Sequence, residues 1–177
     1  MSGALEDLGV DPAGRVCLDA GASTGGFTDA LLQRGARVVY AVDVGYGQLA
    51  WRLRQDERVV VMERTNIRDL ARLDGPPPEL AVGDLSFISL RQVLPAIRRL
   101  LIPEAELLML LKPQFELGRG RVGKGGVVRS QEDRDEALSG FTAWAAAEGL
   151  EVLGSAPSRV VGAKGNQEYF VHMKTHV

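Results

Sequence analysis

The sequence has one cysteine, two histidines and no apolar run of 18 residues or more. A single cysteine excludes a disulfide within the chain and a cysteine-based zinc site, and two histidines are too few for a metal cluster. We expect Cys17, in the first apolar segment, to be a small buried residue. The few cysteines and histidines predict a chain that uses no metal. Because no segment is long enough to span a bilayer, we also expect no membrane partner.

The chain also lacks a secretory signal and a strong net charge. Its first residues show no basic stretch followed by an apolar one, so we expect a cytoplasmic protein. The 177 residues, 45% of them hydrophobic, suffice for one substantial core, and we predict a single domain over residues 1–177. With a formal net charge of −2, any contact with nucleic acid must come from a local basic surface.

The first glycine-rich turn lacks two common motifs, the dinucleotide pattern G-x-G-x-x-G and the phosphate-binding pattern G-x-x-x-x-G-K-[ST]. Instead, the apolar segment 16–20 leads into Gly21, Gly25 and Gly26. Glycines let the main chain approach a ligand closely, and we expect the N–H groups of this turn and of the following helix to face a cofactor. No lysine follows to hold a phosphate, so the pattern favours a nucleoside with an uncharged tail.

Apolar stretches alternate with helical patterns along the chain, which is typical of successive strand–helix units. We expect strands at 15–20, 37–43, 58–62, 79–84, 105–111, 150–156 and 167–174. We expect helices at 25–34, 47–55, 89–101 and 131–148, the third capped by Ser89. The alternation predicts an α/β fold with a doubly wound, mainly parallel sheet that ends in an antiparallel hairpin.

Four charged residues stand at predicted strand ends, where ligands collect in a doubly wound sheet. Asp43 follows the second strand and suits a ribose hydroxyl pair, with a turn aspartate as the alternative. Asp84 and Lys112 end the fourth and fifth strands, which adjacency would bring together, either for chemistry or as a structural ion pair. Glu168 begins the last strand and is either a second site carboxylate or an exposed residue of an edge strand.

Two further pairs of residues flank these strand ends. Asn66 and Ile67 follow the third strand and could meet a base edge, although a helix cap explains Asn66 equally well. Phe87 and Phe115 flank the polar motifs. We expect both rings to pack in the core, with stacking on a base as the alternative.

Residues 117–130 form a glycine-rich segment that contains basic residues and no acidic one. Its four cations are Arg119, Arg121, Lys124 and Arg129. A segment of this composition can remain a solvated loop. Its charge favours the other interpretation, a lid over a polyanion.

Six motifs follow one another in an order that covers almost the whole chain: DAGASTGGFT, DVGYGQL, DLSFISL, KPQFE, GKGGVVR and KGNQEYF. They closely resemble the TlyA family, which are FtsJ-like S-adenosylmethionine-dependent ribosomal RNA methyltransferases. The resemblance implies a class I methyltransferase (Rossmann-like) fold whose seven-stranded sheet has an antiparallel last strand. It also implies S-adenosyl-L-methionine as cofactor, rRNA in ribosomal subunits as partner, and methylation of ribose 2′-hydroxyls as a step of rRNA processing.

The active site of this family resembles a Lys-Asp-Lys-Glu tetrad, and three members match Asp84, Lys112 and Glu168. The first lysine and the small N-terminal RNA-binding domain have no counterpart here, so we expect a catalytic domain alone. The cations of segment 117–130 are predicted to bind RNA phosphates. The residues predicted to contact the cofactor are Asp19, Gly21, Ala22, Ser23, Gly25, Gly26, Phe27, Asp43, Val44, Asn66, Ile67 and Asp84.

A sulfonium methyl group is intrinsically reactive, so the protein mainly has to orient the attacking oxygen. Because Asp84 and Glu168 favour its ammonium form, we expect Lys112 to orient the ribose hydroxyl as a cation rather than to act as a base. One alternative is a methyltransferase-like RNA-binding module without full activity. A remote one is a serine hydrolase, since Ser23, Asp84 and His172 follow the order of a hydrolase triad. Hemolysin activity, sometimes attached to names in this family, finds no support in a chain without a spanning segment.

Overall fold

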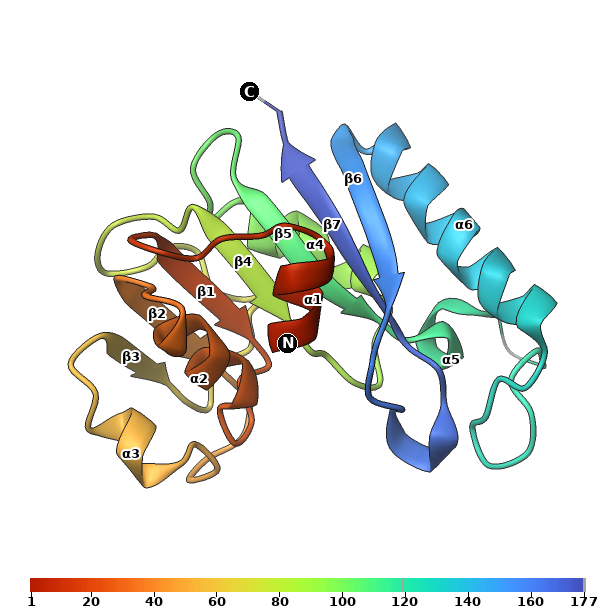
Figure 1. Cartoon of the computed structure of the whole chain (residues 1–177), viewed down its shortest axis with the longest axis horizontal. Coiled ribbons are helices and arrows are strands. Elements are labelled where there is room, and N and C mark those ends of the chain that lie inside the picture. Colours follow the sequence, from red (N-terminus) through yellow and green to blue (C-terminus); the bar gives the residue numbers. More distant parts are fainter. Residues whose placement is uncertain (119, 177) are drawn as a thin grey trace.

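A seven-stranded sheet runs through the molecule, with helices packed on its two faces (Figure 1). The computed structural model describes residues 1–118 and 120–176. The strands are β1 (Val16–Ala20), β2 (Val38–Val42), β3 (Val59–Met62), β4 (Leu80–Gly83), β5 (Glu106–Leu111), β6 (Leu150–Pro157) and β7 (Tyr169–Thr175). The helices are α1 (Ser2–Asp7), α2 (Gly26–Gln33), α3 (Trp51–Arg54), α4 (Leu90–Arg98), α5 (Pro113–Glu116) and α6 (Gln131–Ala147), with a 3₁₀ turn at Ala163–Gly165.

The strand order is β3-β2-β1-β4-β5-β7-β6, in which β1 to β5 are parallel and β7 is antiparallel to both of its neighbours. The predicted doubly wound α/β fold and its antiparallel hairpin are therefore confirmed. The last strand lies inside the sheet, and β6 forms the edge. The order reverses between β1 and β4, and ligands collect beyond the carboxyl ends of strands at such a point.

Each face of the sheet has its own apolar core. One core joins α4 and α6 to the sheet through fully buried side chains such as Leu94 and Phe141. The other joins α1, α2 and α3 through Leu5, Leu31 and Leu53. Cys17 lies in this second core with no exposed surface, and burial raises the pKa of its thiol to about 12. The cysteine is a packing residue, as predicted.

Some helices differ from the predicted ones. In these cases, contacts between residues distant in sequence determine which residues are helical. The predicted helix over 47–55 is wrong in its first half, because Ala50 has extended backbone and its N–H group donates to Thr24. The helix is reduced to α3. Helices α1 and α5 were not predicted; α1 is held by burial of Ala4 and Leu5. The N-cap role of Ser89 is confirmed, since its hydroxyl accepts the Arg91 N–H group at 3.2 Å.

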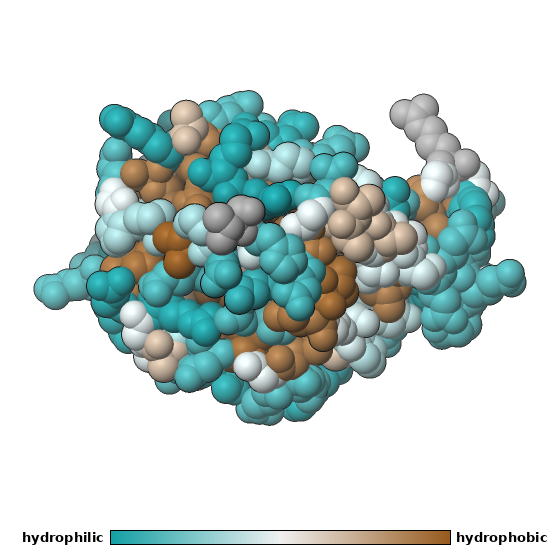
Figure 2. Space-filling view, turned by 90° about the horizontal axis from the view of Figure 1, so that it is seen from above, coloured by the Kyte–Doolittle hydropathy of each residue, from teal (hydrophilic) through white to brown (hydrophobic). Residues whose placement is uncertain are grey.

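The carboxyl ends of the parallel strands point toward the lower edge of Figure 1. Figure 2 shows the molecule from above, turned by 90° about the horizontal axis, and on this face hydrophobic residues gather in patches among hydrophilic ones. Within 1–118 and 120–176, no helix combines the length and apolar character needed to cross a bilayer. In the same residues, no three His, Cys, Asp or Glu side chains are grouped to hold a metal ion.

Candidate active site

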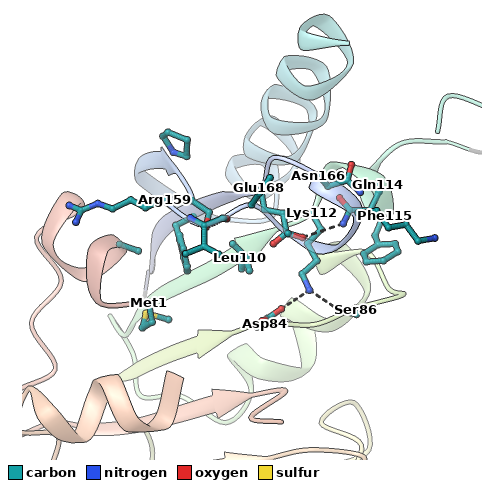
Figure 3. A pocket seen from close by; sticks show the side chains of 18 of the residues that line it. Met1, Asp84, Ser86, Leu110, Lys112, Gln114, Phe115, Arg159, Asn166 and Glu168 are labelled. Carbon is teal, nitrogen blue, oxygen red and sulfur yellow. Dashed lines mark hydrogen bonds and ion pairs between the residues drawn. The ribbon is translucent and has the colours of Figure 1, made fainter. Parts of the chain in front are cut away.

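The carboxyl ends of β4 and β5 bring a carboxylate and an ammonium group into contact. The Lys112 Nζ atom lies 2.6 Å from Asp84 Oδ1 and donates a 2.7 Å hydrogen bond to Ser86 Oγ (Figure 3). The contact follows from topology, because β4 and β5 are parallel neighbours and both residues directly follow their strands. The Lys112 side chain is 10% exposed and that of Asp84 is 40% exposed. The ammonium is therefore held by the protein while the carboxylate still faces open space.

Glu168 joins this corner from β7. Antiparallel pairing places Tyr169 opposite Leu111, so the residue before β7 meets the residue after β5. Glu168 is buried, and its Oε1 accepts a 3.3 Å hydrogen bond from Gln114. The interpretation as an exposed edge-strand glutamate is wrong. Burial raises the pKa of Glu168 above its usual value, while the Lys112 ammonium and the Gln114 hydrogen bond oppose the rise.

The loop beside Glu168 is shaped to admit its carboxylate. A Cβ atom at Gly162 would lie 2.2 Å from Glu168 Oε1, so a larger residue there would collide with the carboxylate. Together, Asp84, Lys112 and Glu168 line one cavity of about 910 Å³, which also takes in Phe87 and Phe115. The three predicted catalytic residues therefore share one opening to solvent.

The glycine turn after β1 is tied to the next strand rather than left open. The N–H groups of Gly21 and Ala22 both donate to Val42 O, and that of Ser23 donates to Asp43 Oδ2 at 2.8 Å. The prediction that these N–H groups face a cofactor is wrong for these three residues. The turn needs glycine for another reason: Gly21 has φ +81°, and a Cβ atom there would lie 2.4 Å from Asp84 O. Close approach to the backbone of Asp84 explains this glycine.

Asp19 lies beneath the turn with no exposed surface. Its Oδ2 accepts a 2.7 Å hydrogen bond from Thr28 Oγ1, while its Oδ1 is buried without a partner among the described residues. Burial raises the pKa of Asp19 to about 7, against the hydrogen bonds of Thr28, and the charges of Asp84 and Asp43 raise it further. An orphaned buried carboxylate oxygen calls for an outside donor, and the ammonium group of S-adenosylmethionine is one that fits.

The segments after β2 and β3 contain further residues predicted to contact the cofactor. Asp43 Oδ1 accepts the Gly45 N–H group at 2.7 Å, so this aspartate shapes its own turn in addition to holding the glycine turn. Val44 is 71% exposed beside it. Asn66 Oδ1 caps a turn by accepting the Arg68 N–H group, and Ile67 is buried in the core. Carboxylate oxygens accept more than one hydrogen bond, so Asp43 can still receive a ribose hydroxyl.

Phe87 stands at the mouth of the cavity and is 90% exposed. Its ring contacts Phe115, with ring centroids 5.4 Å apart. Its backbone has φ +66°, a left-handed conformation that is costly for a bulky residue and that clusters at functional sites. Core packing is therefore the wrong interpretation for Phe87. An exposed ring held in a strained backbone is available to stack on a planar group.

The basic segment 117–130 is fastened to the loop that precedes β7. The Asn166 side chain, which is 3% exposed, accepts the Val128 N–H group at 2.9 Å and donates to Gly126 O at 2.9 Å. Lys164 Nζ donates to Gly125 O at 2.7 Å. These bonds give the segment a defined path at its second half. The sequence signal for this role was the KGNQEYF motif, whose Asn166 was not singled out.

The four predicted RNA-binding cations differ in their surroundings. Arg121 is paired with Asp133 and with Glu136, the latter at 2.5 Å. Lys124 and Arg129 are exposed. Arg119 lies outside the described residues. All three described cations of this segment are therefore on the surface, and Arg121 already has two carboxylate partners.

The hydrolase alternative fails on geometry. His172 Nε2 lies 2.7 Å from Glu106 Oε2, at the beginning of β5. In the strand registers, Glu106 pairs with Leu80, and Leu80 pairs with Cys17. The His172 side chain therefore lies near the beginning of β1, whereas Ser23 follows the end of that strand. A Ser23–His172 contact is impossible, and the triad interpretation is wrong.

The comparisons with known proteins agree with this architecture. The chain is 51% identical over 176 residues to the 16S/23S rRNA (cytidine-2'-O)-methyltransferase TlyA of Mycobacterium tuberculosis, an alignment that covers 99% of this chain and 66% of that protein. The structure of the "Putative hemolysin from Streptococcus thermophilus" matches with a TM-score of 0.95 at 42% identity, over 98% of this chain and 64% of that one. An S-adenosylmethionine dependent methyltransferase from Mesorhizobium loti shares the fold, with a TM-score of 0.68 at 14% identity over 97% of this chain and 96% of the other.

The chain spans 61% to 66% of the length of the first curated relatives that it matches. The FtsJ-like methyltransferase family matches residues 1–175. This match extends over both halves of the sheet, and it includes the glycine turn as well as the three residues of the catalytic corner. The chain belongs to the FtsJ-like methyltransferase family.

Proposed function

We propose that this chain transfers the methyl group of S-adenosylmethionine to a ribose 2′-hydroxyl of ribosomal RNA. The observation that carries the proposal is the convergence of Lys112, Asp84 and Glu168 on one cavity, with Lys112 Nζ 2.6 Å from Asp84. The similarity to a relative named as an rRNA 2′-O-methyltransferase supports the same substrate class. Such a substrate would place the protein in the cytoplasm.

The cofactor would be held along the ends of β1 and β2. S-adenosylmethionine, when bound, supplies a methyl group activated by a sulfonium charge. Asp19 offers the orphaned Oδ1 atom to its ammonium group, and Asp43 offers carboxylate oxygens to its ribose hydroxyls. The close approach of Gly21 to Asp84 would keep the bound cofactor next to Asp84 and Lys112.

Lys112 would orient the acceptor hydroxyl as a cation. The ion pair with Asp84 and the hydrogen bond to Ser86 fix the direction of its side chain. A fixed cation would donate a hydrogen bond to the acceptor oxygen and stabilise the alkoxide character that it gains as its proton moves away. That proton would pass to a carboxylate of the site, Asp84 or Glu168, while the oxygen bonds to the methyl carbon and the sulfur is left as a neutral thioether. Glu168, buried on the other side, would hold the hydroxyl or the ammonium in place.

The RNA would lie across the cavity mouth. Lys124 and Arg129 are exposed cations able to contact phosphates, and their local charge is needed because the net charge of the chain is −2. A nucleotide must leave its stack for its 2′-hydroxyl to enter the cavity, and Phe87 offers a ring on which the freed base could stack.

A methyl-transfer assay on isolated ribosomal subunits and on naked rRNA tests this function. We expect label from S-adenosylmethionine to enter rRNA, and mapping of the product to place it on a ribose 2′-oxygen. Transfer to one substrate form only would define whether folded subunits are recognised. RNA binding without any transfer would contradict the proposal and favour an RNA-binding module.

A further inference from the structure

Glu116 is a buried carboxylate that the catalytic corner does not use. It is the last residue of α5, four positions after Lys112, and its side chain is 1% exposed. Its Oε2 accepts a 2.7 Å hydrogen bond from Ser89 Oγ, and its Oε1 accepts a 2.7 Å hydrogen bond from the Leu90 N–H group. Arg91 Nε lies 3.7 Å from Oε2. Both carboxylate oxygens thus bind the beginning of α4.

The residues that Glu116 binds end the loop that carries the acidic side of the corner. This loop, residues 84–89, leaves β4 at Asp84, contains Ser86 and the strained Phe87, and ends at the N-cap of α4. Lys112 holds its first half through Asp84 and Ser86. Glu116 holds its last residue. The short segment 112–116 therefore grips loop 84–89 at both ends.

Capping of α4 alone does not account for Glu116. Ser89 already supplies the ordinary N-cap, because its hydroxyl accepts the Arg91 N–H group. A negative charge is favourable at a helix N-terminus, but burying a carboxylate is costly unless its oxygens are paired, and an exposed acidic residue of α4 itself would serve the helix equally well. The first turn of α4 contains no acidic residue. The charge instead comes from the segment that carries Lys112.

We propose that Glu116 is a positioning residue for methyl transfer, which fixes loop 84–89 at the height where Asp84 and Ser86 meet Lys112 and where Phe87 faces the cavity. The inference rests on the proposed function for its kinetic consequence. Glu116 touches neither cofactor nor substrate in this arrangement. Its effect passes through the backbone of Ser89 and Leu90 to the loop.

The test compares Glu116→Ala and Glu116→Gln with a control, Ile97→Val. The control substitution lies in α4, the helix whose beginning Glu116 binds. Ile97 is buried near the other end of α4, eight positions after Ser89, and loss of its methyl group weakens the same helix away from its N-cap. We expect Glu116→Ala to lower kcat about tenfold or more, because small misplacements at a reacting centre can cost up to about 10²-fold. The KM for rRNA and the Kd for S-adenosylmethionine should change little. Glu116→Gln keeps an acceptor for Leu90 and should lose less activity than Glu116→Ala.

A second measurement is independent of methyl transfer. Chymotrypsin cleaves after aromatic residues, and Phe87 is exposed in the loop that Glu116 is inferred to fix. We expect cleavage after Phe87 to be faster in Glu116→Ala than in the wild type and in Ile97→Val. Each protein is digested at the same interval below its own melting temperature. Failure of the proposed function would show as a wild type that transfers no methyl group while this cleavage difference persists.

Two results would overturn the inference. One is an unchanged rate of cleavage after Phe87 in both Glu116 variants. The other is a loss of kcat in Ile97→Val equal to that of the Glu116 variants, since a general weakening of α4 would then explain the effect. If Glu116→Ala does not fold, the rate of cleavage after Phe87 and the kcat are compared between Glu116→Gln and Ile97→Val instead.

Discussion

The two glycine-rich segments of this chain are held in different ways. The first, residues 21–26, is bonded to the strand beside it, through Val42 and Asp43. The second, residues 117–130, is bonded to residues 164–166, about forty positions along the chain. The first lies over the buried Asp19 and beside Asp84, whereas the second carries exposed cations.

The difference connects each segment to one part of the proposed reaction. Residues 21–26 are fixed by their neighbours in the sheet, which suits a rigid floor for a cofactor that is the same in every turnover. Residues 117–130 are bonded to the buried side chain of Asn166, which lies two positions before Glu168, and to Lys164. RNA bound by the second segment, as proposed, would thereby be linked to the beginning of β7, next to Glu168. Substitutions in the two segments should consequently separate cofactor binding from RNA binding.

The largest contrast is expected between Gly21→Ala and Gly125→Ala. Both glycines have positive φ angles, +81° and +85°. A Cβ atom at Gly21 would lie 2.4 Å from Asp84 O, whereas a Cβ atom at Gly125 would have no other atom within 4 Å. Gly125→Ala should cost only about 1 kcal/mol of backbone strain. Gly21→Ala should cost roughly 2–4 kcal/mol, since overpacking against backbone adds to that strain, and should lower the melting temperature by about 5–15 °C.

Calorimetry with S-adenosylmethionine and thermal unfolding measure both effects. Gly21→Ala should weaken cofactor binding, and Gly125→Ala should leave it unchanged. Equal losses in the two variants would show that the close approach of Gly21 to Asp84 has no functional weight.

Asp19→Asn sharpens the cofactor side of the comparison. The folded pKa of about 7 lies above the value of about 3.9 in an unfolded chain, so the folded state holds the extra proton between these values. The stability that Asp19 contributes is fully present below about pH 4 and is lost as pH rises toward 7. Asp19→Asn keeps an acceptor for Thr28 and should flatten this fall, seen as a smaller decrease in melting temperature from pH 4.5 to 7.5.

The same variant tests the proposed ammonium contact. Loss of a charge-assisted hydrogen bond should weaken S-adenosylmethionine binding by roughly ten- to a hundredfold at pH 8. Wild-type affinity should rise from pH 6 to pH 8, and that of Asp19→Asn should not. Identical pH profiles in calorimetric titrations would remove Asp19 from the cofactor site.

Asn166→Ala tests the clamp on the second segment. It leaves the Val128 N–H group without its partner, at a cost of about 1–3 kcal/mol in stability. RNA affinity should fall roughly tenfold, because each residue ordered on binding costs about 1–2 kcal/mol. Cofactor affinity should stay the same. Asn166→Asp keeps the acceptor for Val128 and loses the donor to Gly126, so an intermediate effect in RNA-binding titrations is expected, and an effect of Asn166→Ala on cofactor binding alone would contradict the assignment.

The smallest expected effects distinguish the cations of the second segment. Lys124→Ala and Arg129→Ala should each reduce the salt dependence of RNA binding by roughly one unit of slope. Arg121→Ala should change it little, since Arg121 is engaged by Asp133 and Glu136. Binding isotherms at several salt concentrations measure this. A full unit of slope lost with Arg121 would mean that RNA displaces these carboxylates.

The strand–helix alternation and the contact between Asp84 and Lys112 could be predicted from the sequence, because adjacent parallel strands bring the residues at their carboxyl ends together. Once Asp84 and Lys112 end neighbouring strands, their contact follows without knowledge of other side chains. The clamp by Asn166 could not be predicted, since its partners lie about forty residues away and no periodicity marks them. The exposure of Phe87 could not be predicted either, because the left-handed backbone at this residue is not marked by the apolar composition of residues 85–88.

Methyl transfer to rRNA by Lys112→Ala and Lys112→Arg, measured beside calorimetry of S-adenosylmethionine binding, shows whether a charged Lys112 orients the acceptor hydroxyl. We expect kcat to fall about 10²–10³-fold in Lys112→Ala, Lys112→Arg to keep partial activity, and the cofactor Kd to stay unchanged in both variants. Complete loss in Lys112→Arg with intact cofactor and RNA binding would argue against an orienting cation, because arginine keeps the positive charge but cannot act as a neutral base.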